Sequence, residues 1–413
     1  MAIASNNTLL TNKLVTLVAV RAAENAAYLT VGSQAKFKSQ LVGKNNGQSY
    51  DFYIRDTGDA VNRLAYQAGD KVNIAERKVT LSLDPWHIML DFNAIESVTD
   101  IEDWEDEIAK VQGVKLIQKV VKKTIDNDLG KVGTAFIGSG FTPLSQASAH
   151  VASVANGELY GFCAPQVEAI LTSNGQQFVP VSAPDMYSKG LLGRFHGAEY
   201  RAQRFLPTLN LSKAVSDALN GATVSAVVDN NNGDIGGAGT WTVTLSNSDL
   251  NGLTIPKATP LFFDGVMACD IVGDPTETMQ AFIVLESVTA SGSTVDITVR
   301  AQDIKAGGTR TIAKEDGSSF ANLAAIAGAN VIAPEAGRYY TGIVRVEGAM
   351  EFETLDKLDA AGAEYEKSPN VAGINLHQNK LVDLKSMETS CRWDIVTLAG
   401  VIESRGVAMF YCK

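Results

Sequence analysis

Cysteine and histidine are scarce in this chain of 413 residues, which contains four of each. The cysteines are Cys163, Cys269, Cys391 and Cys412, and no two have the CxxC spacing of a zinc or redox site. So few cysteines exclude a disulfide scaffold, and we expect small buried apolar side chains in a reducing compartment. The histidines are His87, His150, His196 and His377, and none has metal-ligand spacing to another histidine or a cysteine. The sequence therefore predicts no metal centre and structural or surface roles for the histidines.

Long apolar runs are also lacking, since none reaches the ~18 residues that a membrane-spanning helix needs. The most apolar run, Leu14–Val20, follows a single lysine and has no clear cleavage site, so a signal peptide is not expected. No lipid-anchor motif is present, and synthesis in a cytoplasm is the default expectation. Residues 10–28 predict an Ala-rich helical arm whose apolar residues nearly encircle it, so this arm should pack against another element.

Positive charge is in deficit, because 46 Asp and Glu outnumber 35 Lys and Arg and give a net charge of -11. A generally basic coat for nucleic acid is thereby excluded. Catalytic signatures such as GxSxG, HExxH and Walker sequences are absent too, and Gly190, Gly193 and Gly197 match no phosphate-loop pattern. We interpret these glycines as tight turns before a strand. Glu351 and Glu353 alternate on an expected strand, but no enzyme is predicted and no cofactor is implied.

The chain does contain enough apolar residues for a large core. Hydrophobic residues make up 45% and charged residues 20%, which predicts a globular protein with two or three domains. Alternating patterns predict strands at 49–55, with Tyr50, Phe52 and Ile54 on one face, and at 77–84. Together with the polar segment between them, these strands make a long ribbon that cannot bury its apolar face alone. The ribbon either folds back on its own chain or lies on a neighbouring subunit.

The clearest helix is expected at 101–128. Thr99 and Glu102 form a capping box, and apolar residues recur every three or four positions from Trp104 to Leu129. Acidic residues crowd the first turns and lysines the later turns, which complements the helix dipole. These lysines are Lys115, Lys119, Lys122 and Lys123. They are either a nucleic-acid patch or a solvated helix face, and the solvated face is the preferred interpretation.

An α/β section follows from Pro143, with a helix at 144–154, a strand at 159–163 and a second helix from Pro165. Residues 211–325 predict a small independent β-barrel or sandwich, with 13 acidic against 6 basic residues. Its expected strands, and those of the remaining chain, lie at 240–245, 281–285, 295–299, 339–347, 380–384, 392–403 and 407–411. Asp229 and Asp234 in its loop 229–239 could be calcium ligands, but the loop does not fit the calcium-loop pattern, so an exposed loop is expected.

The order of these parts resembles that of tailed-phage major capsid proteins of the HK-97-like fold. Among them the chain is most similar to the P-twenty-two-like coat proteins, which carry an inserted β-barrel domain. Three stretches carry the resemblance: Arg77–Asp84 before the long helix, Gly190–Pro207 before the insert, and Arg392–Tyr411 at the end. The resemblance covers essentially the whole chain and comes from the order and spacing of its parts.

The resemblance implies an α+β fold in seven parts. These are an N-terminal arm (1–32), an extended loop, or E-loop, with flanking peripheral-domain strands (33–98), the peripheral domain (99–154) with spine helix 99–129, a first axial part (155–210), the inserted β-barrel domain (211–330), a second axial part (331–390) and a C-terminal strand (391–413). The extended loop would contact a neighbouring subunit through Tyr50, Phe52, Ile54 and Arg55. Asp229 and Asp234 would lie in a loop that contacts adjacent capsomers.

The implied function is the icosahedral shell around the double-stranded DNA of a tailed phage, found in the virion capsid and assembled in the host cytoplasm. The implied partners are copies of the chain in hexamers and pentamers, a separate scaffolding protein, a portal protein, a decoration protein and DNA bound without sequence specificity, with no membrane. The alternatives are a bacterial nanocompartment shell of the same fold, a β-rich tail or surface-adhesion protein, and a hydrolase with dispersed carboxylates. Under the capsid interpretation, Ile54→Asp should block assembly, and deletion of 211–325 should leave a foldable, assembly-impaired remainder.

Overall fold

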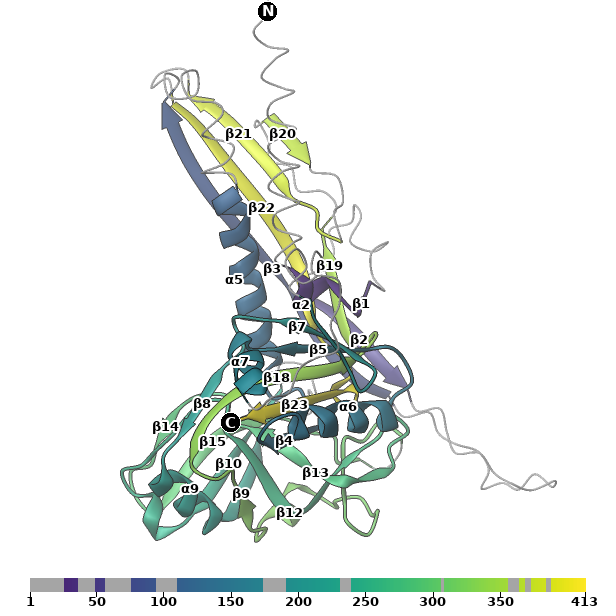
Figure 1. Cartoon of the computed structure of the whole chain (residues 1–413), viewed down its shortest axis with the longest axis vertical. Coiled ribbons are helices and arrows are strands. Elements are labelled where there is room, and N and C mark those ends of the chain that lie inside the picture. Colours follow the sequence, from purple (N-terminus) through teal and green to yellow (C-terminus); the bar gives the residue numbers. More distant parts are fainter. Residues whose placement is uncertain are drawn as a thin grey trace, which may run out of the picture. The chain divides into compact units, whose positions relative to one another are not determined.

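A computed structural model describes residues 26–35, 49–55, 76–93, 110–173, 191–230, 239–305, 308–355, 364–367, 373–383 and 388–413 (Figure 1). The chain divides into two compact units. The first contains Met1–Tyr50, Ser82–Asp126 and Met350–Gly400, and the second contains Asp51–Leu81, Asn127–Ala349 and Val401–Lys413. Helices and strands are mixed in both, so the fold class is α+β, as predicted.

A sheet of long strands is the main feature of the first unit (Figure 1). Its central strand β22 (Glu388–Val401) pairs antiparallel with β21 (His377–Asp383) and with β3 (Glu76–Asn93). The other members are β2 (Ser49–Arg55) beside β3, β19 (Met350–Thr354), β1 (Ser33–Gln34) parallel to β19, and β20 (Glu364–Lys367) beside β21. The helices of this unit are α2 (Ala27–Thr30) and α5 (Lys110–Asp128). Buried side chains of β22, such as Trp393 and Ile395, give this sheet its core.

The strand predicted at 77–84 is confirmed, but it continues to Asn93 through Pro85. Pro85 lies opposite Val396 of β22, and that part of β3 has no second strand beside it among the described residues. A proline is tolerated on such an edge because its missing N–H removes no ladder hydrogen bond. The helix predicted at 101–128 ends at Asp128 as expected and is described from Lys110, while Thr99 and Glu102 lie outside the described residues.

The second unit contains a seven-stranded sheet in which the C-terminal strand lies next to the edge strand β4 (Thr134–Gly138). The order is β4 (Thr134–Gly138), β23 (Val407–Cys412), β18 (Gly337–Val346), β5 (Leu159–Cys163), β7 (Ala198–Ala202) and β6 (Leu191–Phe195), with β8 (Thr208–Leu211) also on β18. All six residues of β23 are buried. Helix α6 (Thr142–Val154) packs over β23, β4 and β18, and α7 (Pro165–Ser173) follows β5. The predicted strand at 159–163 and the two predicted helices are thus confirmed.

Two glycines allow aromatic rings to lie directly on this sheet. A Cβ atom at Gly161 would overlap the ring of Tyr200, and one at Gly342 would overlap the ring of Phe410. The two rings meet edge to face with centroids 6.2 Å apart, and the Tyr200 hydroxyl lies 2.7 Å from the hydroxyl oxygen of Ser148 on α6. Glycine at both positions therefore brings helix and sheet into close contact.

The strands of the predicted insert, together with β17 (Val331–Ile332) just after it, form three small sheets within the second unit. They are β9 (Thr223–Asp229), β10 (Thr240–Ser246) and β15 (Thr294–Arg300); β11 (Thr254–Ile255) and β14 (Val288–Thr289); and β12 (Pro260–Cys269), β13 (Pro275–Ile283), β16 (Ile312–Lys314) and β17 (Val331–Ile332). Stacked rings of Phe263 and Phe282, with centroids 4.4 Å apart, lie in their core. A single closed barrel stays a prediction.

Several local expectations differ from the structure. The short helix α9 (Lys213–Asn220), whose N-cap Ser212 accepts a hydrogen bond from the Val215 N–H, was not predicted. Gly197 lies in the turn between β6 and β7 as expected, but Gly193 lies within β6 at a bulge. The short 3-10 helices are η3 (Ser248–Leu250), η4 (Leu323–Ile326) and η5 (Ser404–Gly406). None of the described helices is both long and apolar enough to cross a membrane.

Candidate assembly surfaces

The strand β2 (Ser49–Arg55) pairs with β3 to form the predicted ribbon. Tyr50 and Phe52 are only 8% and 5% exposed, so the chain itself already covers these two predicted contact residues. Ile54 is half-buried, and the side chain of Arg55 lies outside the description. On the opposite face, Tyr53 is 55% exposed. The outward-facing aromatic residue of β2 is therefore Tyr53.

A cross-strand pair fixes the register of this ribbon on its exposed side. Asp51 of β2 accepts a hydrogen bond of 2.8 Å from the Thr80 hydroxyl and lies 3.0 Å from the Lys78 ammonium nitrogen. The hydrogen bonds from Lys78 and Thr80 lower the pKa of the Asp51 carboxyl. Because both charged groups are largely in water, the pair contributes little to folding free energy and mainly selects the alignment of the two strands.

The two predicted acidic contact residues are not brought together within the described structure. Asp229 ends β9 opposite Trp241, and its side chain is half-exposed. Asp234 lies outside the described residues. Their role in contacts between capsomers stays a prediction.

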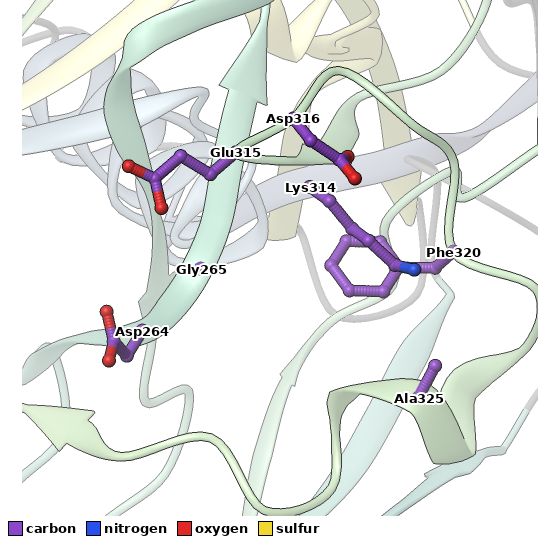
Figure 2. Close-up of a pocket in the computed structure, with 7 residues that line it drawn as sticks. All are labelled: Asp264, Gly265, Lys314, Glu315, Asp316, Phe320 and Ala325. Atoms are coloured by element: carbon purple, nitrogen blue, oxygen red, sulfur yellow. The ribbon is translucent and has the colours of Figure 1, made fainter.

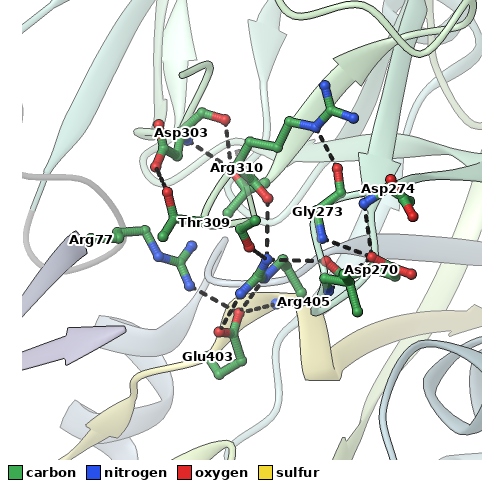
Figure 3. Close-up of polar contacts among 12 residues, drawn as sticks. Arg77, Asp270, Gly273, Asp274, Asp303, Thr309, Arg310, Glu403 and Arg405 are labelled. Atoms are coloured by element: carbon green, nitrogen blue, oxygen red, sulfur yellow. Dashed lines mark hydrogen bonds and ion pairs between the residues drawn. The ribbon is translucent and has the colours of Figure 1, made fainter. Parts of the chain in front are cut away.

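A buried group of three charged residues holds the base of β3 to the C-terminal segment (Figure 3). We call Arg77, Glu403 and Arg405 the anchor cluster. Arg77 donates a hydrogen bond from Nη2 to Oε1 of Glu403 at 2.9 Å. Arg405 donates a hydrogen bond to each carboxylate oxygen of Glu403, from Nε to Oε1 at 2.9 Å and from Nη2 to Oε2 at 2.9 Å. Such bidentate pairs are among the strongest charge-assisted hydrogen bonds in proteins.

The electrostatics of the anchor cluster keep its carboxylate ionised. Burial alone would raise the pKa of Glu403, but the charge of Arg77 and the hydrogen bonds and charge of Arg405 outweigh it and lower the pKa to about 2. One carboxylate faces two guanidinium groups, so one positive charge is in excess. Backbone carbonyl oxygens accept hydrogen bonds from the guanidinium of Arg405. Nη1 of Arg405 donates to the carbonyl oxygens of Asp270 at 3.1 Å and Gly308 at 2.6 Å. The cluster thereby also holds two loops of the insert.

One of these loops is a rigid turn with an apolar tip, Asp270–Asp274, between β12 and β13. The Asp270 carboxylate accepts hydrogen bonds from the backbone N–H groups of Val272, Gly273 and Asp274 at 2.8–2.9 Å. The Arg310 Nε donates to the carbonyl oxygen of Gly273 (Figure 3). The turn presents Ile271 and Val272, which are 39% and 50% exposed. Because the backbone of the turn is already ordered, the turn would lose little conformational entropy when a partner binds its tip.

An open depression of about 520 Å³ lies beside β12 and β16 (Figure 2). It is lined by Asp264, Gly265, Lys314, Glu315, Asp316, Phe320 and Ala325. The Lys314 ammonium lies 5.9 Å from the centre of the Phe320 ring, and hydrogen bonds from Ser318 lower the pKa of Asp316. Three carboxylates against one ammonium make this an acidic surface, and its openness suits contact with a basic surface better than capture of a small apolar ligand.

The described cysteines are not arranged for nucleophilic chemistry. Cys163, Cys269 and Cys412 are all buried, as predicted. Burial raises the pKa of the Cys163 thiol, and it raises the pKa of Cys269 to about 12 and that of Cys412 to about 11. At neutral pH these thiols are protonated and act as small apolar side chains. Among the residues that the structure describes, no group of three His, Cys, Asp or Glu could hold a metal ion.

Comparison with known proteins finds similarity only among solved structures. No family model and no curated protein matches the sequence. A structure from Mycobacterium phage Che8 aligns over 92% of this chain and 89% of its own, with 10% identity and a TM-score of 0.42. The capsid of Ralstonia phage GP4 aligns over 92% and 87%, with 8% identity and a TM-score of 0.45. A virus-like particle from Pyrococcus furiosus aligns over 96% and 97%, with 6% identity and a TM-score of 0.40.

Bacteriophage capsid proteins are thus prominent among these structural neighbours. At such identities, and with these TM-scores below 0.5, no family is assigned on this likeness.

Strand β2, the turn at 270–274 and the anchor cluster differ in how well each could be predicted from the sequence. Alternating residues predicted β2 directly. The turn at 270–274 carries a signal that could have been recognised, because an aspartate followed three residues later by glycine favours a side-chain-capped turn. Arg77 and Glu403 are 326 positions apart and have no such local signal. Only the packed sheet brings them together.

Proposed function

We propose that the chain is a major capsid protein, which assembles with copies of itself into a closed icosahedral shell around the double-stranded DNA of a tailed phage. The observation that carries the proposal is the order of the elements. The ribbon of β2 and β3 is followed by the long amphipathic helix α5, an α/β section, a β-rich insert and the buried terminal strand β23. This is the order that the resemblance to HK-97-like coat proteins implies.

The way the ribbon is fixed gives physical support to this proposal. Its base is held by the anchor cluster, in which Arg77 has a side chain only 1% exposed. Its outward face presents Tyr53, 55% exposed, beside the charged pair of Lys78 and Asp51. Interfaces between proteins are enriched in aromatic residues at their centre and polar residues at their rim. A rigidly anchored arm with an exposed tyrosine is therefore suited to lie on a neighbouring copy.

The finer assignments belong to the same proposal. Residues 33–98 would contain the extended loop, 99–154 the peripheral domain, 155–210 and 331–390 the axial domain, and 211–330 an outward-facing insert of the P-twenty-two-like kind. The proposed partners are further copies in hexamers and pentamers, a scaffolding protein, a portal protein, a decoration protein and packaged DNA. The proposed location is the virion capsid, after assembly in the host cytoplasm.

Electron microscopy of the purified full-length chain tests the function directly. The chain is expressed with and without a candidate scaffolding protein encoded nearby, and closed shells of uniform size are expected in at least one preparation. Solitary subunits at every concentration and with every candidate scaffold would contradict the proposal. Shells that enclose an enzyme encoded beside the chain, with no DNA, would favour the nanocompartment alternative.

The exposed tyrosine supplies a sharper test of how the shell is built. Tyr53→Asp should reduce the yield of shells at least tenfold, because a charge would be desolvated at the contact, while the subunit keeps its thermal midpoint. Ile332→Asp is the matched control, since Ile332 is also an exposed apolar side chain on a strand, 38% exposed, and lies outside the predicted contact loop 229–239. If the Tyr53 variant forms shells at the same yield as the control variant, the outward face of β2 is not part of the interface.

A further inference from the structure

Helix α5 has two unlike faces. One is buried and consists of Leu116, Ile117, Val120, Val121 and Ile125, each at most 3% exposed. The other is exposed and carries three lysines at spacings of four and three residues: Lys115, Lys119 and Lys122. We call these three the basic stripe. With a rise of 1.5 Å per residue, the stripe extends for about 10 Å along the helix.

The basic stripe differs from the fourth lysine of this segment. Lys123 lies 2.6 Å from the Asp84 carboxylate and 5.4 Å from the centre of the Trp86 ring, so it has a structural role within the first unit. Within the part of the chain that the structure describes, no hydrogen bond or ion pair involves the three ammonium groups of the basic stripe. Their charge therefore has no partner among the described residues.

The charge pattern also differs from that of an ordinary solvated helix face. Such faces usually place acidic residues three or four positions from lysines, which stabilises the helix. Lys115 and Lys119 have no acidic residue at those spacings, and Lys119 lies four positions from each of two like charges and three positions from a third. Like charges at these spacings destabilise a helix by a few tenths of a kcal/mol per pair. α5 contains five lysines against two aspartates, although the whole chain has a net charge of -11.

We propose that the basic stripe binds the phosphate backbone of double-stranded nucleic acid without reading its sequence, an inference that rests on the proposed shell function. Lysine ammonium groups on flexible stems contact phosphates without fixed geometry, and B-DNA offers one negative charge per ~1.7 Å of axis. A protein partner fits less well, because lysine is depleted in protein interfaces. Among the described residues of α5, Val111, 44% exposed, is the one exposed large apolar side chain near the stripe.

The expected binding is weak and sensitive to salt. Three phosphate contacts contribute a slope of about -2.7 to the dependence of log K on log salt concentration. The overall negative charge of the chain opposes association, so the contact is weak and is highly occupied only where DNA is concentrated. This property suits a container that must hold DNA and release it again.

The test measures fluorescence anisotropy of a labelled 25-base-pair duplex of arbitrary sequence with the full-length chain, at 50 to 200 mM NaCl. The variant Lys115→Gln, Lys119→Gln, Lys122→Gln should bind at least tenfold more weakly at 50 mM, and its salt slope should be smaller by about 2 to 3. The control is Lys213→Gln, Lys257→Gln, Lys305→Gln, which removes the same charge from the second unit. It should bind nearly as the parent does, and circular dichroism should show equal helix content in all three proteins.

Each result has a definite meaning. Equal losses in the two triple variants, or no loss in either, would overturn the inference. Unchanged DNA binding combined with failed shell assembly in the stripe variant would also overturn it and would indicate an acidic protein surface as the partner. If the parent chain never forms shells but the stripe variant binds DNA more weakly than the parent, the inference about the basic stripe is supported and the proposed shell function is rejected. The two failures can therefore be told apart.

Discussion

At the scale of single residues, the partners of a buried polar group determine what it does to stability. Glu403 is surrounded by two guanidinium groups and stays charged. His150 on α6 is buried too, but its Nδ1 lies 3.3 Å from the Thr278 hydroxyl and its Nε2 has no partner among the described residues. No carboxylate stabilises its protonated form, and burial lowers its pKa to about 4. Both sites should therefore lose stability in acid, but in different pH ranges.

His150 should make the protein lose stability as the pH falls from about 6.5 to about 4. In this window the unfolded chain binds a proton at His150 and the folded chain does not, so acid favours unfolding. A pKa lowered from 6.5 to about 4 corresponds to a loss of about 3 kcal/mol by pH 4, at 1.36 kcal/mol per unit. Urea unfolding at half-unit pH intervals should show this loss in the parent and a flatter profile in His150→Gln.

The control for this prediction is His87→Gln, at an exposed position on β3. It should keep the steep profile of the parent between pH 6.5 and 4. Parallel profiles for the parent and His150→Gln would show that other groups cause the acid sensitivity. The anchor cluster should contribute mainly below this range, because its stabilisation is lost as the pH falls from the ordinary glutamate pKa of 4.5 to about 2.

At the scale of elements, the end of α5 shows how a distant strand completes a helix. The last carbonyl groups of any helix lack intrahelical partners. Here Arg300 of β15 donates from Nη2 to the Asn127 carbonyl at 2.6 Å and from Nε to the Leu129 carbonyl at 3.3 Å. Burial lowers the pKa of Arg300, and the charge of Asp128 opposes this shift. A cation at the helix C-terminus also interacts favourably with the helix dipole.

Replacing Arg300 should destabilise the second unit and loosen the last turn of α5. Arg300→Gln removes the charge and the pair of hydrogen bonds to the Asn127 and Leu129 carbonyl oxygens. We expect the free energy of unfolding, measured in urea, to fall by about 1–3 kcal/mol. Arg300→Lys keeps the charge and one donor and should cost less. Hydrogen exchange should accelerate at the last turn of α5 more than at α6. Uniform acceleration over the whole unit would mean that Arg300 supports general packing and does not cap the helix.

Elements with strong local patterns could be predicted from the sequence, and those without could not. Strict alternation located β2, β10 and β15, and the spacing of apolar residues located the end of α5 at Asp128. The predicted strand at 77–84 was too short, because β3 continues through Pro85 to Asn93 and pairs with β22 along that part. The candidate surfaces were harder to predict. Tyr50 and Phe52 have the alternation of a contact face, but alternation cannot say whether the covering surface belongs to the same chain.

At the scale of the whole molecule, the insert is joined to its surroundings more tightly than its composition suggests. The Tyr411 hydroxyl of the terminal strand donates to the Ala258 carbonyl at 2.8 Å. The Gln280 amide donates to the Val132 carbonyl at 2.8 Å, and the Thr134 hydroxyl donates to the Met279 carbonyl at 2.8 Å. These bonds join the insert to β4 and β23, the strands at one side of the seven-stranded sheet. Both parts fall in one compact unit.

These contacts change the expected outcome of removing the insert. Deletion of 211–330 with a short Gly-Ser linker would leave the Tyr411 hydroxyl and the Arg405 guanidinium without their partners in the insert, and would expose the side of the sheet that the insert covers. Each unpaired buried group costs about 1–3 kcal/mol, and a charged group costs more, against a typical domain stability of about 5–15 kcal/mol. We therefore expect the shortened chain to lose cooperative thermal unfolding in calorimetry, and residues 211–330 expressed alone to show no sharp transition either. A cooperative transition in both pieces would instead mean that the insert is the independent domain its composition predicts, with the hydrogen bonds to β4 and β23 serving only to dock it.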